Sequence, residues 1–363
     1  MKAFVTGGTG FIGQHVVRKL LQRGYEVYAL ARAEAGAEAM RALGANPVIG
    51  DITDMESMRE GMTGSDVVFH IAGWYKYGDD DWMKAEMINV GGTRKVLRLA
   101  YELGVPKIIY TSTVAVFGDT KGEMVDETYH SNGPFLTEYD RTKWLAHYKV
   151  AIPLIEKGAP IIIVMPGGVF GPGDPSWIAE LMRLYYRGVP MVPGPESVIT
   201  WAHVEDVAEG HILAAEKGRI GESYILAGPA VSLGEMVAFW SYITGKRPAG
   251  WHVPARALRP MAPAAGLLQS ALPLPSLFSR ELTTSLGATY MASADKARTE
   301  LGWETRALHN DMLETFEWIA ATTPAGVSLP LDERQKKAAR VALLAALALF
   351  LIWLLKRREG DAA

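Results

Sequence analysis

Residues 6–13 read Thr6-Gly7-Gly8-Thr9-Gly10-Phe11-Ile12-Gly13, and this glycine-rich stretch is the strongest indication of the fold. It lies between an apolar run over 2–6, which predicts a β-strand, and a helical pattern over 12–23. Gly7, Gly10 and Gly13 let the backbone turn sharply and approach a diphosphate. Phe11 and Ile12 open a helix whose free N–H groups and dipole favour such an anion. The stretch therefore predicts a dinucleotide site; a tight turn without a ligand is the alternative.

Beyond this stretch, strand-like and helical patterns alternate. Further strands are predicted over 26–31, 47–49, 66–71, 107–113 and 161–165, and helices over 90–103 and 139–155. Strands separated by helices predict an α/β fold, a Rossmann doubly wound parallel sheet with right-handed crossovers. We assign the cofactor-binding core to 1–165. The more irregular residues 166–322 are predicted to form a smaller substrate-binding subdomain that partly returns to the core.

The ends of the next strands predict which dinucleotide binds. A carboxylate after the second strand would hold the ribose 2′-hydroxyl of NAD, but the chain has Arg32 there, which can pair with the 2′-phosphate of NADP. NADP(H) is therefore favoured, with NAD(H) as the alternative. Asp51 and Ile52 are placed at the adenine, and the small residues Ala72 and Gly73 at the adenosine ribose. His70 is predicted to be packed rather than catalytic.

Tyr139 and Lys143 are four residues apart on a predicted helix and therefore share one face. A phenol is a poor acid at neutral pH, because its ordinary pKa is about 10. A Lys ammonium ~4 Å away is worth roughly 4 kcal/mol at an effective dielectric of about 20, enough to lower that pKa by about three. Lys143 could also hold the ribose hydroxyls. Ser112 and Thr113 end the preceding strand, where a hydroxyl can bond the substrate oxygen beside Tyr139.

Several motifs together resemble the extended short-chain dehydrogenase/reductase superfamily, of the NAD-dependent epimerase/dehydratase type. These are TGGTGFIG (6–13), HIAG (70–73), NVGGT (89–93), YTSTVAVFG (110–118), YDRTK (139–143) and PGGVFGPGD (166–174). The resemblance covers residues 1 to about 319. It implies that Thr113, rather than Ser112, is the catalytic hydroxyl beside Tyr139 and Lys143. It also implies that Asn89 supports the active-site side of the cofactor and that Pro166 and Val169 lie beside the nicotinamide.

Within the superfamily, Arg32 and the YDRTK segment look most like the dihydroflavonol/cinnamoyl-CoA reductase branch. Sugar-nucleotide members usually carry an Arg before their His-Val-x-Asp segment, whereas residues 198–203 contain none. We therefore expect an NAD(P)H-dependent oxidoreductase that reduces a carbonyl, or oxidises the matching alcohol, on a small and fairly apolar substrate. The alternatives are a nucleotide-sugar epimerase or dehydratase with retained NAD, and a non-catalytic, membrane-tethered NADP-binding scaffold.

The amino-acid composition limits the kinds of partner that the chain is expected to bind. The chain has 363 residues, a formal net charge of −3, no cysteine and eight histidines. The absence of a basic excess argues against nucleic acid. Without cysteine there is no thiolate chemistry and no Cys-ligated zinc, and the histidines lack metal-ligand spacing, so no metal is expected. A homodimer is kept as an expectation.

The C-terminal part carries a different signal. Residues 341–355 have no polar side chain, and Ala338, Ala339 and Arg340 extend them to a segment of roughly 27 Å at about 1.5 Å per residue, close to the ~30 Å hydrocarbon core of a bilayer. Basic residues flank both ends. We expect a membrane anchor over 338–355, reached through a linker over 323–337; a buried or dimerising helix is the alternative. The start of the chain shows no signal peptide, so the catalytic body is expected in the cytoplasm.

Overall fold

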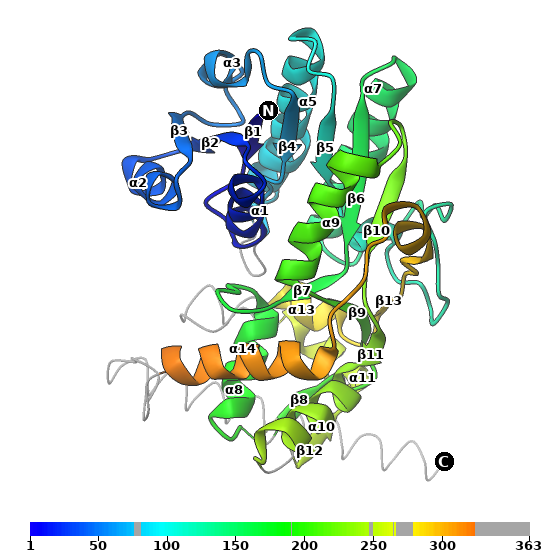
Figure 1. Ribbon diagram of the computed structural model, residues 1–363. Coiled ribbons are helices and arrows are strands. Elements are labelled where there is room, and N and C mark those ends of the chain that lie inside the picture. Colours follow the sequence, from blue (N-terminus) through cyan, green and yellow to red (C-terminus); the bar gives the residue numbers. More distant parts are fainter. Residues whose placement is uncertain (76–80, 190, 247–249, 264, 266–278, 324–363) are drawn as a thin grey trace, which may run out of the picture.

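The computed structural model describes residues 1–323, except 76–80, 190, 247–249, 264 and 266–278 (Figure 1). Its centre is a seven-stranded sheet in the order β10-β6-β5-β4-β1-β2-β3, with every neighbouring pair parallel. The strands are β1 (Lys2–Thr6), β2 (Glu26–Ala31), β3 (Asn46–Ile49), β4 (Val67–His70), β5 (Ile108–Thr111), β6 (Ile161–Pro166) and β10 (Ser223–Leu226). The order reverses between β1 and β4, so a ligand crevice is expected at the carboxyl ends of these two strands. The predicted Rossmann fold is confirmed.

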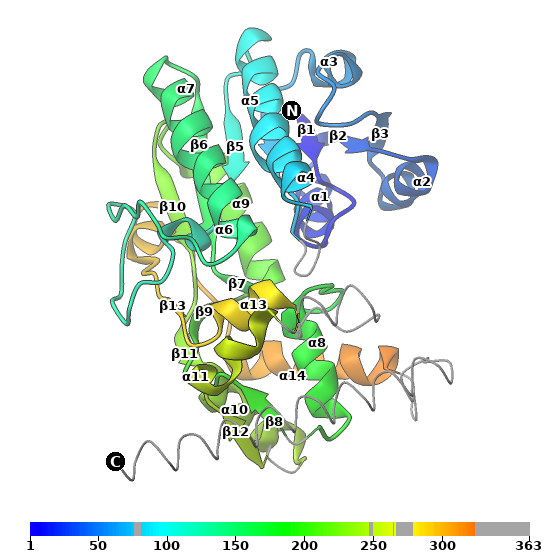
Figure 2. The ribbon, with the colours of Figure 1, turned by 180° about the vertical axis from the view of Figure 1, so that it is seen from behind.

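Helices cover both faces of this sheet. Figure 1 shows α1 and α9 on one face, and Figure 2, from behind, shows α5 and α6 on the other. The helices of this part are α1 (Phe11–Gln22), α2 (Glu34–Leu43), α3 (Glu56–Met62), α4 (Trp82–Glu86), α5 (Thr93–Glu102), α6 (Glu138–Ala146), α7 (Ile152–Glu156) and α9 (Val204–Lys217). Fully buried aliphatic and aromatic side chains from the strands and both helix layers form one core.

Two predicted helices are interrupted by wider π-turns. The helix expected over 90–103 begins as the π-segment η1 (Met87–Gly92) and continues as α5, and the helix expected over 139–155 divides into α6, η3 (His147–Ala151) and α7. Pro153 lies in the first turn of α7 and has no N–H to donate to the preceding turn, which accounts for the second interruption. The apolar periodicity of the sequence does not reveal a helical turn that is wider by one residue.

A second, smaller layer follows β6. Its strands are β7 (Gly168–Phe170), β8 (Met191–Pro193), β9 (Val198–His203), β11 (Ala230–Ser232), β12 (Trp251–Val253) and β13 (Thr289–Tyr290). β9 pairs with β7, β11 and β13, and β8 pairs with β12. The helical segments are α8 (Trp177–Tyr186), α10 (Leu233–Thr244), α11 (Ala255–Leu258), η4 (Arg259–Met261), α13 (Arg280–Ser285), η6 (Ala297–Leu301) and α14 (Leu308–Thr322). α8, α10 and α14 bury a second core of their own. In the large sheet, the short 3-10 helix η2 (Val114–Phe117) follows β5.

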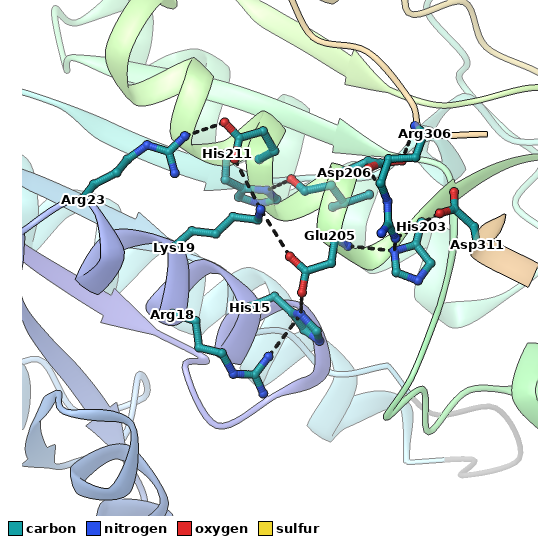
Figure 3. A network of polar contacts seen from close by, with 12 residues as sticks. His15, Arg18, Lys19, Arg23, His203, Glu205, Asp206, His211, Arg306 and Asp311 are labelled. Atoms are coloured by element: carbon teal, nitrogen blue, oxygen red, sulfur yellow. Dashed lines mark hydrogen bonds and ion pairs between the residues drawn. The ribbon is translucent and has the colours of Figure 1, made fainter. Parts of the chain in front are cut away.

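A polar network joins α1 to α9 and reaches Arg306 (Figure 3). Nδ1 of His15 lies 2.5 Å from Oε1 of Glu205, and Nζ of Lys19 lies 3.2 Å from Oε2 of the same carboxylate. Further along α1, Arg23 pairs with Glu209 at 2.5 Å. The helix that begins at the glycine-rich turn is thereby fixed to the helix that leads out of the second layer.

Within the described residues, no helix has the length and apolarity needed to cross a membrane. The predicted anchor over 338–355 and residues 324–337 of the predicted linker lie outside the described residues.

Candidate active site

A cavity of about 580 Å³ opens at the carboxyl ends of β1, β4 and β5, between the large sheet and the second layer. It brings together nearly all of the site residues predicted from the sequence. The predicted residues that line it are Gly7, Gly10, Phe11, Ile12, Gly13, Arg32, Asp51, Ile52, Ala72, Gly73, Thr113, Tyr139, Lys143, Pro166 and Val169.

The glycine-rich turn forms a cradle that tolerates no side chain at two positions. Gly7 has a φ of +77°, and a Cβ there would lie 2.5 Å from the backbone nitrogen of Ala72. A Cβ on Gly13 would lie 2.0 Å from the carbonyl oxygen of Gly7. Gly10 precedes α1, and no side chain caps the N–H groups of the first helical turn. Close backbone and free N–H groups at a helix start fit a dinucleotide diphosphate.

The adenosine end is bounded by Arg32 and Asp51. Arg32 is exposed, and among the described residues its guanidinium has no hydrogen-bond or ion-pair partner, so it is free to meet an anion. Oδ1 of Asp51 accepts from the backbone N–H and the hydroxyl of Thr53 at 2.8 and 2.7 Å. These two bonds fix the turn that carries Asp51 and Ile52 to the cavity wall.

Asn89 has a different place from the rest of the predicted cofactor set. It is buried in η1 and is not among the residues that line the cavity. Its Oδ1 accepts from the N–H of Trp74 at 2.7 Å, while its Nδ2 donates to the carbonyl of Trp74 at 3.1 Å and to the hydroxyl of Thr142 at 3.0 Å. Asn89 was predicted with the cofactor-binding residues, but the structure places it behind the cavity wall, where it ties the loop after β4 to α6 because both of its amide atoms are bonded inside the protein.

The hydroxyls of Ser112 and Thr113 are used differently. Oγ of Ser112 lies 2.8 Å from Nδ1 of His147, inside the protein. Oγ1 of Thr113 accepts from the N–H of Ala115 at 3.2 Å, donates to the carbonyl of Pro166 at a long 3.5 Å, and interacts with the phenol of Tyr139. The Thr113 hydroxyl therefore lies where it can also meet a ligand oxygen, while Ser112 is held by His147.

Tyr139 and Lys143 both lie on α6 and face the cavity. Burial raises the pKa of Tyr139, the Thr113 hydroxyl lowers it, and Asp140 raises it further. Nζ of Lys143 donates to the carbonyl of Thr111 at 2.8 Å, and burial lowers its pKa to about 7. The net effect of the surroundings is to raise the pKa of Tyr139, with burial as the largest cause, whereas a lowering by Lys143 was expected. Nζ of Lys143 is directed to the end of β5.

Three histidines fill the space behind the strand ends. His70 lies between the hydroxyls of Thr6 and Thr93 at 2.8 and 2.9 Å, and burial lowers its pKa to about 3. His147 and His211 are held by Ser112 and Thr111 in the same way, with pKa values lowered by burial to about 3 and about 4. They are neutral packing groups, as predicted for His70.

The far half of the cavity is mostly apolar. Its lining from the second layer includes Trp177, Ile178, Ile199, Leu233, Leu282 and Leu286. Two polar residues stand out there, Asp140 and Tyr290, which the sequence analysis did not select. Asp140 directly follows Tyr139 in the YDRTK segment, so its position was a usable signal. Nothing local marks Tyr290, which comes to the cavity from β13.

Among the described residues, one cluster outside the cavity has donor atoms of the kind that hold metals. Ligand atoms of His203, Asp311 and Glu314 lie within 4.8 Å of one another. The guanidinium of Arg306 contacts His203 and lies 3.0 Å from Asp311 and 3.3 Å from Glu314. Arg306 therefore supplies the positive charge of this cluster (Figure 3).

The chain is similar to a known protein family and to several characterised relatives. The sequence profile of the "NAD dependent epimerase/dehydratase family" matches residues 3–227. A 4-hydroxy-2-methyl-3-oxo-4-farnesyl-3,4-dihydroquinoline-1-oxide ketoreductase of Stigmatella aurantiaca is 31% identical over 90% of this chain and 98% of its own. A Synechocystis protein described as a dihydroflavonol 4-reductase is 35% identical over 67% of this chain and 72% of its own.

Among solved structures, the crystal structure of gox2253 is similar. It superposes with a TM-score of 0.77 at 32% identity, covering 88% of this chain and 98% of that one. The family match spans more than half of the chain and includes the cradle, Tyr139 and Lys143. The chain accordingly belongs to the NAD dependent epimerase/dehydratase family and is a nicotinamide-dependent oxidoreductase of the extended short-chain dehydrogenase/reductase type.

Proposed function

We propose that the protein uses NADPH to reduce a carbonyl group on a small, fairly apolar compound, or oxidises the matching alcohol. One observation carries the proposal: Thr113, Tyr139 and Lys143 line the same cavity as the glycine cradle. A proton donor, a hydroxyl and a cation thus stand beside a place for a dinucleotide. That is the set of groups that a hydride transfer to a carbonyl requires.

The cofactor would be held along the first half of the cavity. Gly7, Gly10, Phe11, Ile12 and Gly13 would hold the diphosphate, with Arg32, Asp51, Ile52, Ala72 and Gly73 at the adenosine end and Pro166 and Val169 beside the nicotinamide. When bound, a reduced nicotinamide supplies the hydride that the carbonyl carbon receives.

The protein's own groups manage the oxygen of that carbonyl. The hydroxyl of Thr113 donates to it and polarises the C=O bond. Tyr139 then gives its phenolic proton to the oxygen as the carbon gains the hydride, and the phenolate regains a proton from solvent. Lys143 holds the cofactor ribose hydroxyls and adds positive charge at the end of β5. Burial raises the pKa of Tyr139, which keeps its proton in place until the oxygen becomes basic.

The apolar far wall supports a substrate of low polarity. The Stigmatella relative is named for a ketone that carries a farnesyl chain, which is consistent with this class. A sugar nucleotide would bring a second diphosphate. Among the described lining residues the cations are Arg32, Lys84 and Lys143, none of them an arginine on the far side. Arg183, which could have served, instead lies 4.8 Å over the ring of Trp318.

The preference for NADP over NAD rests on Arg32. We expect Arg32→Ala to raise the KM for NADPH by about 10- to 100-fold, because one charge-assisted contact to the 2′-phosphate is lost. The KM for NADH should change less than about threefold. Equal effects on both cofactors would remove Arg32 from this role.

We also propose that residues 338–355 anchor the protein to a membrane. In this division of the chain, residues 1–165 form the cofactor core, residues 166–322 the substrate portion and residues 323–337 the linker to the anchor. The support is the length and apolarity of the segment in the sequence. The test compares the fraction of the full chain and of a chain ending at Pro330 that partitions into membranes in the absence of detergent. Equal solubility of the two would contradict an anchor.

Function is tested by a screen for oxidation of NADPH and NADH with ketones, aldehydes and UDP- or dTDP-sugars. We expect net NADPH consumption with ketones or aldehydes. Conversion of a sugar nucleotide without net cofactor consumption would instead establish an epimerase or dehydratase. Cofactor binding without turnover of any compound would favour a non-catalytic scaffold.

A further inference from the structure

The ammonium of Lys143 is buried without a carboxylate beside it. Lys143 is only 6% exposed, and within the described residues its Nζ forms no ion pair. In that part of the chain its hydrogen bond goes to the carbonyl of Thr111, at 2.8 Å. An ammonium has three protons to donate, and burying its charge without partners is costly. The charged form of Lys143 therefore depends on partners other than an acid.

The aromatic ring of Tyr110 is the second partner of this ammonium. Nζ of Lys143 lies over the ring, 5.1 Å from its centroid, which is within the range of a cation–π contact. Such a contact strengthens when it is shielded from water, and Tyr110 is fully buried. Tyr110 directly precedes Thr111 on β5, so the ring and the carbonyl meet Nζ from successive residues of one strand.

The ring of Tyr110 is fixed by its neighbour in the sheet. His70 on β4 pairs with Tyr110 in register, and its imidazole stacks on the ring with centroids 5.6 Å apart and planes 19° apart. Burial lowers the pKa of His70 to about 3, so the imidazole is neutral and brings no second cation to the ring. The ring is therefore a rigid surface for a single ammonium.

The carbonyl of Thr111 belongs to a residue that is fixed from the other helix layer. Nδ1 of His211 on α9 lies 2.7 Å from the carbonyl of Val207, so Nδ1 carries the proton and Nε2 is left to accept one. The hydroxyl of Thr111 donates to this Nε2 at 2.8 Å. Both partners of the Lys143 ammonium are thus held in place by side chains behind them.

The other titratable groups around Lys143 do not replace these partners. Burial lowers the pKa of His70 on β4 and of His147 on η3 to about 3, so both rings are uncharged at neutral pH. On α6 itself, burial raises the pKa of Tyr139, and Asp140 accepts a hydrogen bond from β13 and makes no ion pair among the described residues. The ring of Tyr110 is therefore the main attraction for the charge.

We propose that Tyr110 is a positioning residue for the reaction: its ring holds the Lys143 ammonium in place and favours its charged form through a cation–π contact. This inference rests on the role proposed for Lys143 at the cofactor ribose. With one proton on the Thr111 carbonyl, Nζ keeps the others for ligand atoms in the cavity that Lys143 lines. Tyr110 is not among the residues that line this cavity, so it acts through Lys143.

The test changes the electrons of the ring while its shape stays nearly constant. Tyr110→Phe keeps the ring, and phenylalanines with one, two and three ring fluorines in place of Tyr110 weaken its negative face step by step. The pKa of Lys143 is followed in the full chain, free and loaded with NADPH, by the carbon-13 NMR shift of its ε-carbon. Lys143→Met identifies the resonance by its absence.

Loss of the contact should lower the pKa of Lys143, because the charged form loses its partner. Burial already lowers this pKa to about 7. We expect Tyr110→Phe to leave the pKa within about 0.3 of the wild type, and the trifluorinated ring to lower it further by about 0.5 to 1.5. A pKa that does not change with the number of fluorines would overturn the proposal.

The pH profile of turnover gives a second readout. Charged Lys143 is the form that serves the reaction, so kcat/KM for a ketone should fall as the pH rises through the pKa of Lys143. This basic limb should move to lower pH as fluorines are added. Phe69→Leu is the matched control, because Phe69 is a fully buried ring on β4 and within the described residues no ammonium lies over it. It should lower stability and leave the limb in place.

The two readouts separate this proposal from the proposed reaction. A fluorine-dependent pKa of Lys143 in a protein that reduces no carbonyl would support the contact and defeat the reaction. Ketone turnover with a basic limb and a pKa that ignore the fluorines would do the reverse. Variants at 110 that lose stability and rate together, with the limb unmoved, would show that Tyr110 is only a core residue. The monofluorinated ring serves if the trifluorinated form fails to fold.

Discussion

Two neighbouring hydroxyls at the end of β5 have different partners, and this difference decides which of them can act. Ser112 is bonded to His147, whereas Thr113 interacts with the phenol of Tyr139. We expect Thr113→Val to lower kcat/KM by about 100- to 1000-fold, because one donor to the developing oxyanion is lost. Ser112→Ala should cost less than about tenfold. The assignment would be contradicted if the two effects were reversed.

His147 makes the stability of the protein depend on pH. Burial lowers its pKa to about 3, from about 6.5 in an unfolded chain, so between these values the unfolded state binds one proton more. The contribution of His147 is fully present above pH 6.5 and is lost as the pH falls through this window. His147→Gln should reduce the pH slope of the unfolding free energy by about 1.4 kcal/mol per pH unit between pH 6 and 4.

Urea unfolding at several pH values, with the wild type and the variant side by side, checks this slope. Parallel pH curves for the two proteins would show that His147 is not the group that protonates on unfolding.

Residues in local patterns were the predictable part of the site. The glycines of the turn and the pair Tyr139 and Lys143 are set by spacing within one turn or one helix, and the structure brings them to one cavity. What the sequence could not supply is the direction of each polar atom. The ammonium of Lys143 bonds the end of β5, and both amide atoms of Asn89 are satisfied inside the protein, although the sequence alone favoured other partners.

At the scale of elements, α1 and α9 are joined by the carboxylate of Glu205. Its bonds with His15, above all, and with Lys19 lower the pKa of Glu205 to about 2. A carboxyl with a lowered pKa stabilises the fold above its unfolded pKa of about 4.5, and the contribution is lost as the pH falls through 2. Glu205→Gln should therefore cost about 1 kcal/mol at pH 7, a modest value because the group is partly exposed.

This loss is measured by urea unfolding at pH 7 and again below pH 4.5, where the difference from the wild type should shrink. Glu317→Gln, on an exposed face of α14, is the control and should change stability little. A loss for Glu205→Gln that stays the same at both pH values would mean that the charge of Glu205 is not what joins the two helices.

The elements themselves were largely predictable where the pattern is strong. β1 and β2 have the predicted bounds, because apolar runs bounded by polar residues and Gly mark buried parallel strands well. The π-turns at Met87–Gly92 and His147–Ala151 were not predicted, since one extra residue in a turn leaves the apolar pattern nearly unchanged.

For the whole molecule, the cavity is formed by residues from Gly7 to Tyr290, which only the fold brings together. The cofactor half comes from contiguous motifs and could be predicted. The substrate half depends on how β9, β13 and α13 pack against α6, and this packing cannot be predicted from a local sequence pattern. Asp140 and Tyr290 illustrate the limit: they are 150 residues apart in the chain and share a hydrogen bond.

The central claim is that Tyr139 gives the proton to a carbonyl oxygen while the cavity holds NADPH. The most direct test is Tyr139→Phe, which keeps the ring and removes the acidic hydroxyl. NADPH oxidation with a ketone accepted by the wild type should fall at least about 100-fold, while NADPH binding, followed by its fluorescence, stays within about threefold. Turnover by the variant at the wild-type rate would contradict the account.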